Sequence, residues 1–197
     1  MTSRITRYTL LSLFLLINQI HAERKIISIK TPGDLIKFSN KVNNGERIFK
    51  GTVVLENDLD MSKVSSSFNP IGLNKEKTFS GEFDGKGYTL SNLNITTDKS
   101  RYVGLFGYSF GMTLKNLIFD YSSITSAKKS NKHSYLGGFV SYCLSKESGC
   151  VFKNLINMAA LYGHGYEFIG GHYWCNHIRF FINLRFIYRE LFELWKH

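Results

Sequence analysis

Asp58 and Asp60 are the two residues whose type and spacing best suit acid and base chemistry in this sequence. Residues two apart in a strand lie on one face, so a strand over 55–61 would place both carboxylates on the same side. Glycosidases use paired carboxylates of this kind. The same spacing, with Leu59 and Met61 on the opposite face, is also typical of a solvated acidic rim, and we expect that structural role.

Two further groups have side chains that bind protons or metals. Asp84, directly before Gly85, has the pattern of a turn residue whose carboxylate bonds to its own backbone. His172, Cys175 and His177 have metal-ligating side chains, but their spacing matches no established zinc motif. We therefore expect no catalytic residue, no metal and no cofactor.

Positive charge dominates the chain, which has 25 Lys and Arg, 15 Asp and Glu, and a net charge of +10. A polar insertion at 125–134 contains Lys128, Lys129 and Lys132 beside His133, and these lysines form either a basic contact patch or a solvated loop. Excess positive charge attracts acidic partners, so we expect an acidic glycan or a host or cell-surface protein. No nucleic-acid recognition motif is present, and nucleic acid is not expected as a partner.

The first 22 residues have the layout of a secretory signal peptide. Arg4 and Arg7 precede an apolar run over 10–20, and Ala22 is the expected last residue removed. This run is about half the roughly 20 residues that a membrane-spanning helix needs. We expect a secreted or cell-surface protein, with an uncleaved anchor or a transit peptide as alternatives. Membrane association would require the leader or the tail as an anchor.

An oxidising compartment would allow the cysteines to pair. Cys143 and Cys150 are close enough in sequence to close a short loop, which leaves Cys175 without a partner in the chain. Asn94 begins the single Asn-Ile-Thr sequon and is a candidate glycosylation site in a host that glycosylates.

These side chains must be positioned by a chain of 197 residues, which is about one domain. Apolar residues make up 43% and aromatic residues 15%, which excludes a disordered chain. We expect residues 23–50 to hold a short strand and a capping helix. Thr31 is a favourable N-cap, Pro32 suits the first helical position and Asp34 suits the first turn, so the helix should cover about 32–43.

Internal repeats follow from residue 51 onward. One signature is an Asn-Leu strand that recurs at 88–95, 112–119 and 150–157. A Gly-rich signature alternates with it, at 103–108, 137–142 and 170–171. Such repeats predict stacked coils. We therefore expect an all-β, right-handed parallel β-helix over 51–171.

The alignment of the repeats predicts two ladders of like residues along the stack. The bend residues would be Asn92, Asn116 and Asn154, because Asn tolerates the left-handed backbone conformation. The inward residues would be Leu93, Leu117 and Leu155.

The segments 55–60, 69–72, 79–90 and 104–107 resemble the GLUG-motif repeats of bacterial and protozoan surface proteins. Such repeats also occur in noncatalytic regions of IgA-cleaving metallopeptidases. The resemblance covers about 51–171 and implies a secreted or surface β-solenoid. It implies no particular activity.

Residues 172–197 depart from the repeat. Their apolar residues, among them Phe181, Leu184 and Leu191, have the spacing of an amphipathic helix over 178–197 that would cover the last coil. The alternative is a truncated or frameshifted end produced by an error in the gene model.

Together these features predict a noncatalytic secreted or cell-surface scaffold for interaction or adhesion. A carbohydrate-active β-helix enzyme that acts on acidic polysaccharide is one alternative. A truncated, nonfunctional fragment of a longer repeat protein is the other.

Overall fold

The computed structural model describes residues 26–45, 49–97, 100–126, 134–144, 149–162, 167–170 and 184–186. These residues form a mostly β structure in which the strand pairs are parallel and one α-helix is present. The expected signal peptide, the lysines at 128, 129 and 132, and all of the tail except 184–186 lie outside them.

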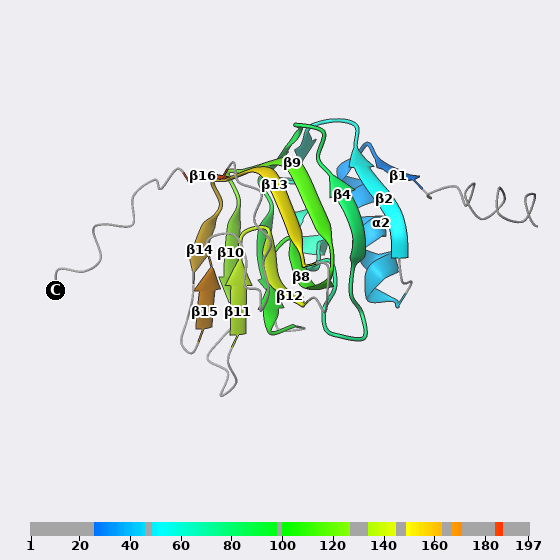
Figure 1. The fold of residues 1–197 in the computed structure, drawn as a ribbon. Coiled ribbons are helices and arrows are strands. Elements are labelled where there is room, and N and C mark those ends of the chain that lie inside the picture. Colours follow the sequence, from blue (N-terminus) through cyan, green and yellow to red (C-terminus); the bar gives the residue numbers. More distant parts are fainter. Residues whose placement is uncertain are drawn as a thin grey trace, which may run out of the picture.

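The N-terminal strand and helix form as predicted. Strand β1 spans Ile26–Ile29 and helix α2 spans Pro32–Asn43. The Thr31 side chain accepts from the Asp34 N–H at 3.2 Å, and the Asp34 carboxylate accepts from the Thr31 N–H at 3.1 Å. This capping box satisfies two backbone donors at the start of the helix. Figure 1 shows α2 at one end of the row of strands, beside β1 and β2.

The strands form four groups, which we name here. The long sheet contains β2 (Phe49–Leu55), β3 (Leu59–Asp60), β4 (Ser80–Asp84), β5 (Thr89–Ser91), β9 (Thr113–Asp120), β13 (Val151–Asn157) and β16 (Leu184–Phe186), together with β1. The β6 sheet contains β6 (Asn94–Thr97), β10 (Ser123–Ser126) and β14 (Ala160–Tyr162). The β7 sheet contains β7 (Tyr102–Val103), β11 (Ser134–Gly137) and β15 (Glu167–Gly170). The β8 pair is β8 (Phe106–Phe110) and β12 (Val140–Leu144).

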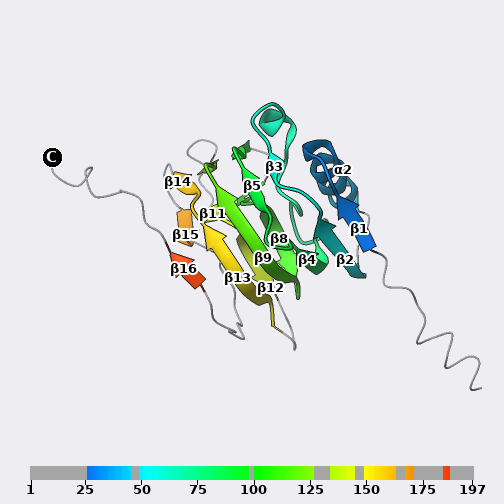
Figure 2. The same ribbon diagram turned by 90° about the horizontal axis from the view of Figure 1, so that it is seen from above.

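The chain passes through these groups in a repeated order. From β4 and β5 it continues to β6, β7 and β8, and then returns to the long sheet as β9. The next pass runs from β9 through β10, β11 and β12 to β13. Each strand therefore lies beside its counterpart from the previous pass, as Figures 1 and 2 show for β4, β9 and β13.

The register brings similar apolar residues together between passes. Val53, Phe83, Leu114 and Phe152 are successive partners along the long sheet, and all four are buried. In the β6 sheet, Ile124 pairs with Ile95 on one side and with Leu161 on the other.

Helix α2 packs against one end of this core. Leu35, Phe38 and Val42 are buried, and the Phe38 ring meets the Phe79 ring edge to face at 5.6 Å. The Phe79 ring in turn stacks on that of Phe106 at 5.4 Å. Such contacts pack the apolar face of the helix against buried aromatic residues of the rest of the chain.

Asn43, the last residue of α2, ties the helix to the neighbouring chain by polar contacts. Its side-chain amide donates to the Pro70 carbonyl at 2.9 Å, and its Oδ1 accepts from the Gly72 N–H at 3.0 Å. Because Asn43 is buried, these bonds replace those that water would make.

One predicted ladder is wrong in part. Asn116 and Asn154 are aligned in neighbouring strands of the long sheet. Asn92 instead lies at a different bend of the chain, directly after β5, where it is aligned with Tyr121 directly after β9. All four residues have positive φ, and therefore the left-handed conformation alone does not identify equivalent corners. Leu117 and Leu155 are buried partners, whereas Leu93, also buried, donates its N–H to the Ser122 hydroxyl.

The Gly-rich signature also shifts by one residue. Val103 pairs with Leu136, so the residue after each, Gly104 and Gly137, is aligned, and Gly137 pairs with Gly170. One additional residue before Val140 then restores the pairing of Val140 with Phe106. A Cβ on Gly104 would lie 2.6 Å from the Gly137 carbonyl oxygen. The backbones approach too closely there for a side chain, which explains the glycine without a phosphate-binding role.

The predicted C-terminal helix is wrong where the structure can be compared with it. Leu184–Phe186 form strand β16, which pairs in parallel with Leu155, Ile156 and Asn157 of β13. The backbone groups at the edge of β13 offer hydrogen bonds that the apolar spacing of the tail did not reveal.

Candidate binding surface

Asp58 and Asp60 are exposed on either side of buried Leu59, and both bind backbone groups. Asp58 Oδ1 accepts from the Thr89 N–H at 2.7 Å, and Asp60 Oδ1 accepts from the Ser62 N–H at 2.9 Å. The bond from Ser62, followed by one from the Asn92 amide, lowers the pKa of Asp60 below its ordinary value. A general acid needs the opposite shift near neutral pH, so this carboxylate is suited to holding a turn.

Asp84 is a buried corner residue. Its Oδ1 accepts from the Lys86 N–H at 2.9 Å, as the turn pattern predicts, and from the Asn116 amide at 3.0 Å. Lys115 Nζ lies 3.4 Å from Asp84 Oδ2 and 2.9 Å from Glu82 Oε1. Burial raises the pKa of Asp84, but these hydrogen bonds and lysine charges outweigh burial and lower it overall.

The disulfide and the sequon lie on different parts of the fold. Cys143 and Cys150 form a disulfide with a Cα–Cα distance of 6.5 Å, and both cysteines are buried. Asn94 is exposed in β6, where its Oδ1 accepts from the Ser123 hydroxyl at 2.7 Å.

Four tyrosines form a cluster that the sequence interpretation did not identify. Tyr102 and Tyr135 are partners in the β7 sheet, and Tyr108 and Tyr142 are partners in the β8 pair. The rings of Tyr102 and Tyr135 stack at 5.3 Å, and that of Tyr142 lies 5.4 Å from Tyr135 and 5.1 Å from Tyr108. We call these four residues the tyrosine cluster.

The cluster lies at the surface. Tyr102, Tyr135 and Tyr142 are partly exposed, whereas Tyr108 is buried. Burial raises the pKa of Tyr102 and of Tyr108, so both phenols keep their protons well above neutral pH. A protonated phenol can donate a hydrogen bond as well as accept one.

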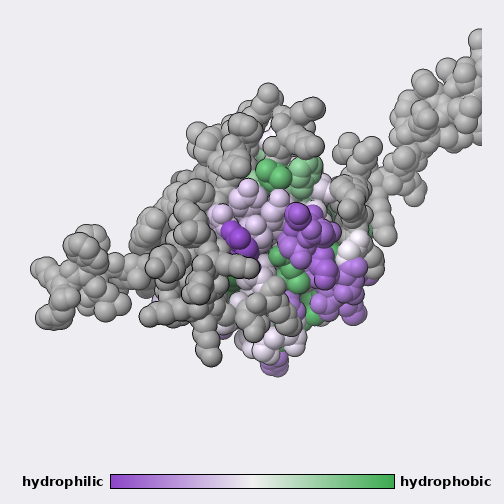
Figure 3. All heavy atoms as spheres, turned by 90° about the horizontal axis from the view of Figure 1, so that it is seen from below, coloured by the Kyte–Doolittle hydropathy of each residue, from purple (hydrophilic) through white to green (hydrophobic). Residues whose placement is uncertain are grey.

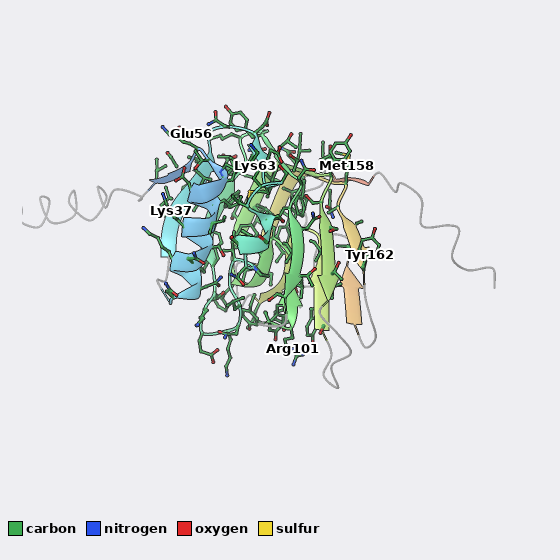
Figure 4. All side chains as sticks on the ribbon, turned by 180° about the vertical axis from the view of Figure 1, so that it is seen from behind. Lys37, Glu56, Lys63, Arg101, Met158 and Tyr162 are labelled. Carbon is green, nitrogen blue, oxygen red and sulfur yellow. A yellow bond between two sulfur atoms is a disulfide. The ribbon has the colours of Figure 1, made fainter. Side chains whose placement is uncertain are left out.

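Arg101 adds a cation to this surface. Its guanidinium lies 5.4 Å from the centre of the Tyr102 ring and 5.1 Å from that of Tyr135, within the range of a cation–π contact. Figure 4 shows Arg101 at the end of the molecule opposite the labelled Lys63, and Figure 3 looks onto the Arg101 end. Hydrophilic side chains border exposed hydrophobic atoms in that view.

The repeats contained a signal for this cluster. Aligning Gly104 with Gly137, as the structure does, places Tyr102 directly over Tyr135. Most of the predicted basic insertion at 125–134 lies outside the described residues, which stop at Ser126 and resume at Ser134, directly before Tyr135 in the sequence.

Two kinds of feature are absent from the described part of the chain. None of its helices is long and apolar enough to cross a membrane. No cluster of three or more His, Cys, Asp or Glu residues there could hold a metal ion. His172, Cys175 and His177 lie outside this part.

Comparison with known proteins finds no matching protein family and no match among curated proteins. Among solved structures, the chain is similar to the crystal structure of a proposed immunoglobulin A1 protease from Bacteroides ovatus. The sequences are 15% identical and the TM-score is 0.46, over 79% of this chain and 48% of that one. The chain thus spans about half the length of that protein.

Proposed function

We propose that this protein is a noncatalytic secreted or cell-surface scaffold for interaction or adhesion. Its architecture in this proposal is a right-handed parallel β-helix of the GLUG-repeat kind. The observation that carries the proposal is the order of the chain, which visits the same groups of parallel strands in successive passes. Stacking of this kind produces extended outer faces suited to binding polymers or other surfaces.

The role of the acidic residues supports a noncatalytic function. Asp58 and Asp60 each accept a hydrogen bond from a backbone N–H. Asp84 accepts one from the backbone N–H of Lys86 and forms an ion pair with Lys115. Retaining and inverting glycosidases need one carboxyl group with a raised pKa. The pKa of both Asp60 and Asp84 is lowered, which favours a structural role for them.

A depolymerisation screen tests this proposal against the enzyme alternative. The purified protein is incubated with acidic polysaccharides, and new reducing ends and unsaturated products are measured over time. We expect no turnover above that of a heat-denatured sample. Reproducible cleavage that Asp58→Asn or Asp60→Asn abolishes would replace the scaffold with an enzyme.

A further inference from the structure

Arg101 differs from the lysines that the structure places in ion pairs. Lys30, Lys37, Lys75, Lys86 and Lys115 each lie within 4.0 Å of a carboxylate oxygen. Arg101 is exposed, and no ion pair joins its guanidinium to a carboxylate among the side chains that the structure describes. Its charge is therefore not taken up by an ion pair among the side chains that the structure describes.

The contacts of Arg101 leave its hydrogen-bonding edge available. A guanidinium that stacks on aromatic rings uses its flat face, while its five N–H groups point outward in the plane. The Tyr102 and Tyr135 rings supply the stacking contact. Because both tyrosines belong to paired strands, they restrict the Arg101 side chain before any ligand arrives, which lowers the entropic cost of binding.

The surroundings of the guanidinium match a sugar acid. A planar guanidinium binds a carboxylate through two parallel hydrogen bonds. The phenol of Tyr102 is protonated at neutral pH, as an ordinary tyrosine is, and burial raises its pKa further. It can therefore exchange hydrogen bonds with sugar hydroxyls. The full chain carries a net charge of +10, and an excess of positive charge attracts a polymer that carries many negative charges.

We propose that Arg101, Tyr102 and Tyr135 form a binding site for the carboxylate of a uronic-acid polysaccharide. Arg101 binds the carboxylate, and the two tyrosines hold Arg101 and border the sugar. This inference rests on the proposed scaffold function and specifies its ligand.

The test is titration calorimetry of the full chain with an oligogalacturonate. Its fully methyl-esterified form lacks the charge and is the control ligand. We expect Arg101→Ala to weaken binding by about 10-fold to 100-fold, the range for losing charge-assisted hydrogen bonds. Arg101→Lys should lose most of the affinity as well, because an ammonium lacks the planar fork. Lys63→Ala removes an exposed positive charge at the other end of the molecule and should leave binding unchanged.

The tyrosines are tested separately from the charge. Tyr135→Leu removes one ring and should weaken binding several-fold, whereas Tyr135→Phe keeps the ring and should bind nearly as well as the wild type. Thermal melts of each variant show whether the fold is intact. If Tyr135→Leu no longer folds, the binding site is tested by Arg101→Ala and Arg101→Lys alone. Both change an exposed residue and should leave the fold intact.

Three results would overturn this inference. The first is equal affinity of the wild type and Arg101→Ala for oligogalacturonate, or no binding by either. The second is binding to dextran sulfate alone, which would assign the site to sulfate. The third is binding to polyglutamate alone, which would assign it to an acidic protein. Cleavage of the oligogalacturonate is a different outcome, because it contradicts the noncatalytic scaffold and leaves the binding site in place.

Discussion

The Asn154 side-chain amide donates a hydrogen bond to Asn116 Oδ1 at 2.9 Å, across 38 residues of sequence. The Asn116 amide in turn donates to Asp84 Oδ1, 32 residues earlier. The φ angle is 54° at Asn116 and 51° at Asn154, a conformation that asparagine tolerates better than most residues. Three successive passes of the chain are thus joined at one corner by a ladder of polar side chains.

Replacing Asn116 should separate the two roles of this ladder. Asn116→Ala loses two side-chain hydrogen bonds and replaces asparagine by a residue that tolerates positive φ less well, with an expected cost of about 2 to 3 kcal/mol. Asn116→Gly loses the bonds without the backbone strain and should cost about 1 to 2 kcal/mol. Urea unfolding measures both free energies. Two variants as stable as the wild type would show that the ladder contributes nothing.

The lowered pKa of Asp84 predicts a loss of stability in acid. Its ionised form stabilises the fold fully above the unfolded pKa of about 3.9, and that contribution disappears as pH falls through the lower folded value. Asp84→Asn should therefore unfold more easily at neutral pH and lose less stability between about pH 5 and pH 2 than the wild type. Urea unfolding at a series of pH values measures this, and parallel curves for both proteins would contradict it.

The close approach of the backbones at Gly104 should make this position intolerant of a side chain. A Cβ there would lie 2.6 Å from the Gly137 carbonyl oxygen, so Gly104→Ala should destabilise the protein by about 1 to 3 kcal/mol. Gly33→Ala, in helix α2, is the matched control, because the atom nearest to a Cβ built at Gly33 is Thr31 Oγ1, 3.7 Å away. That control should be neutral or slightly stabilising. Equal melting temperatures for the two variants would contradict the register of the β7 sheet.

The buried disulfide should stabilise the fold modestly. Cys143 and Cys150 are 7 residues apart, and a loop of that size corresponds to roughly 2 to 3 kcal/mol in the chain-entropy treatment. We expect the double replacement by alanine to lower the melting temperature, and peptide mapping without reductant to recover the linked pair. Recovery of Cys175 bound to either cysteine instead would contradict this pairing.

The sequence predicted where helices and strands form better than it predicted which residues pair between strands. Thr31, Pro32 and Asp34 predicted helix α2 because capping and first-turn preferences are local. The Asn-Leu motif misled at Asn92, since both that corner and the Asn116 corner need a residue that accepts positive φ. Only pairing between strands distinguishes the two corners, and pairing is not a local property.

The tyrosine cluster was missed for the same reason. The sequence alignment of the repeats already paired Tyr108 with Tyr142. It did not pair Tyr102 with Tyr135, because one additional residue before Val140 shifts the register between the two tyrosine pairs. The position of Arg101 beside two rings depends on that register. Likewise, β16 forms on an available strand edge and not through the apolar spacing of its own residues.

The stacking of successive passes is the basis of the proposed scaffold, and backbone NMR tests it most directly. In a uniformly labelled sample, nuclear Overhauser effects are measured between backbone protons of Ile124 and those of Ile95 and Leu161. The account predicts contacts from Ile124 to both residues in a parallel pattern, since it lies between them in the β6 sheet. Antiparallel contacts, or contacts of Ile124 with neither residue, would contradict it.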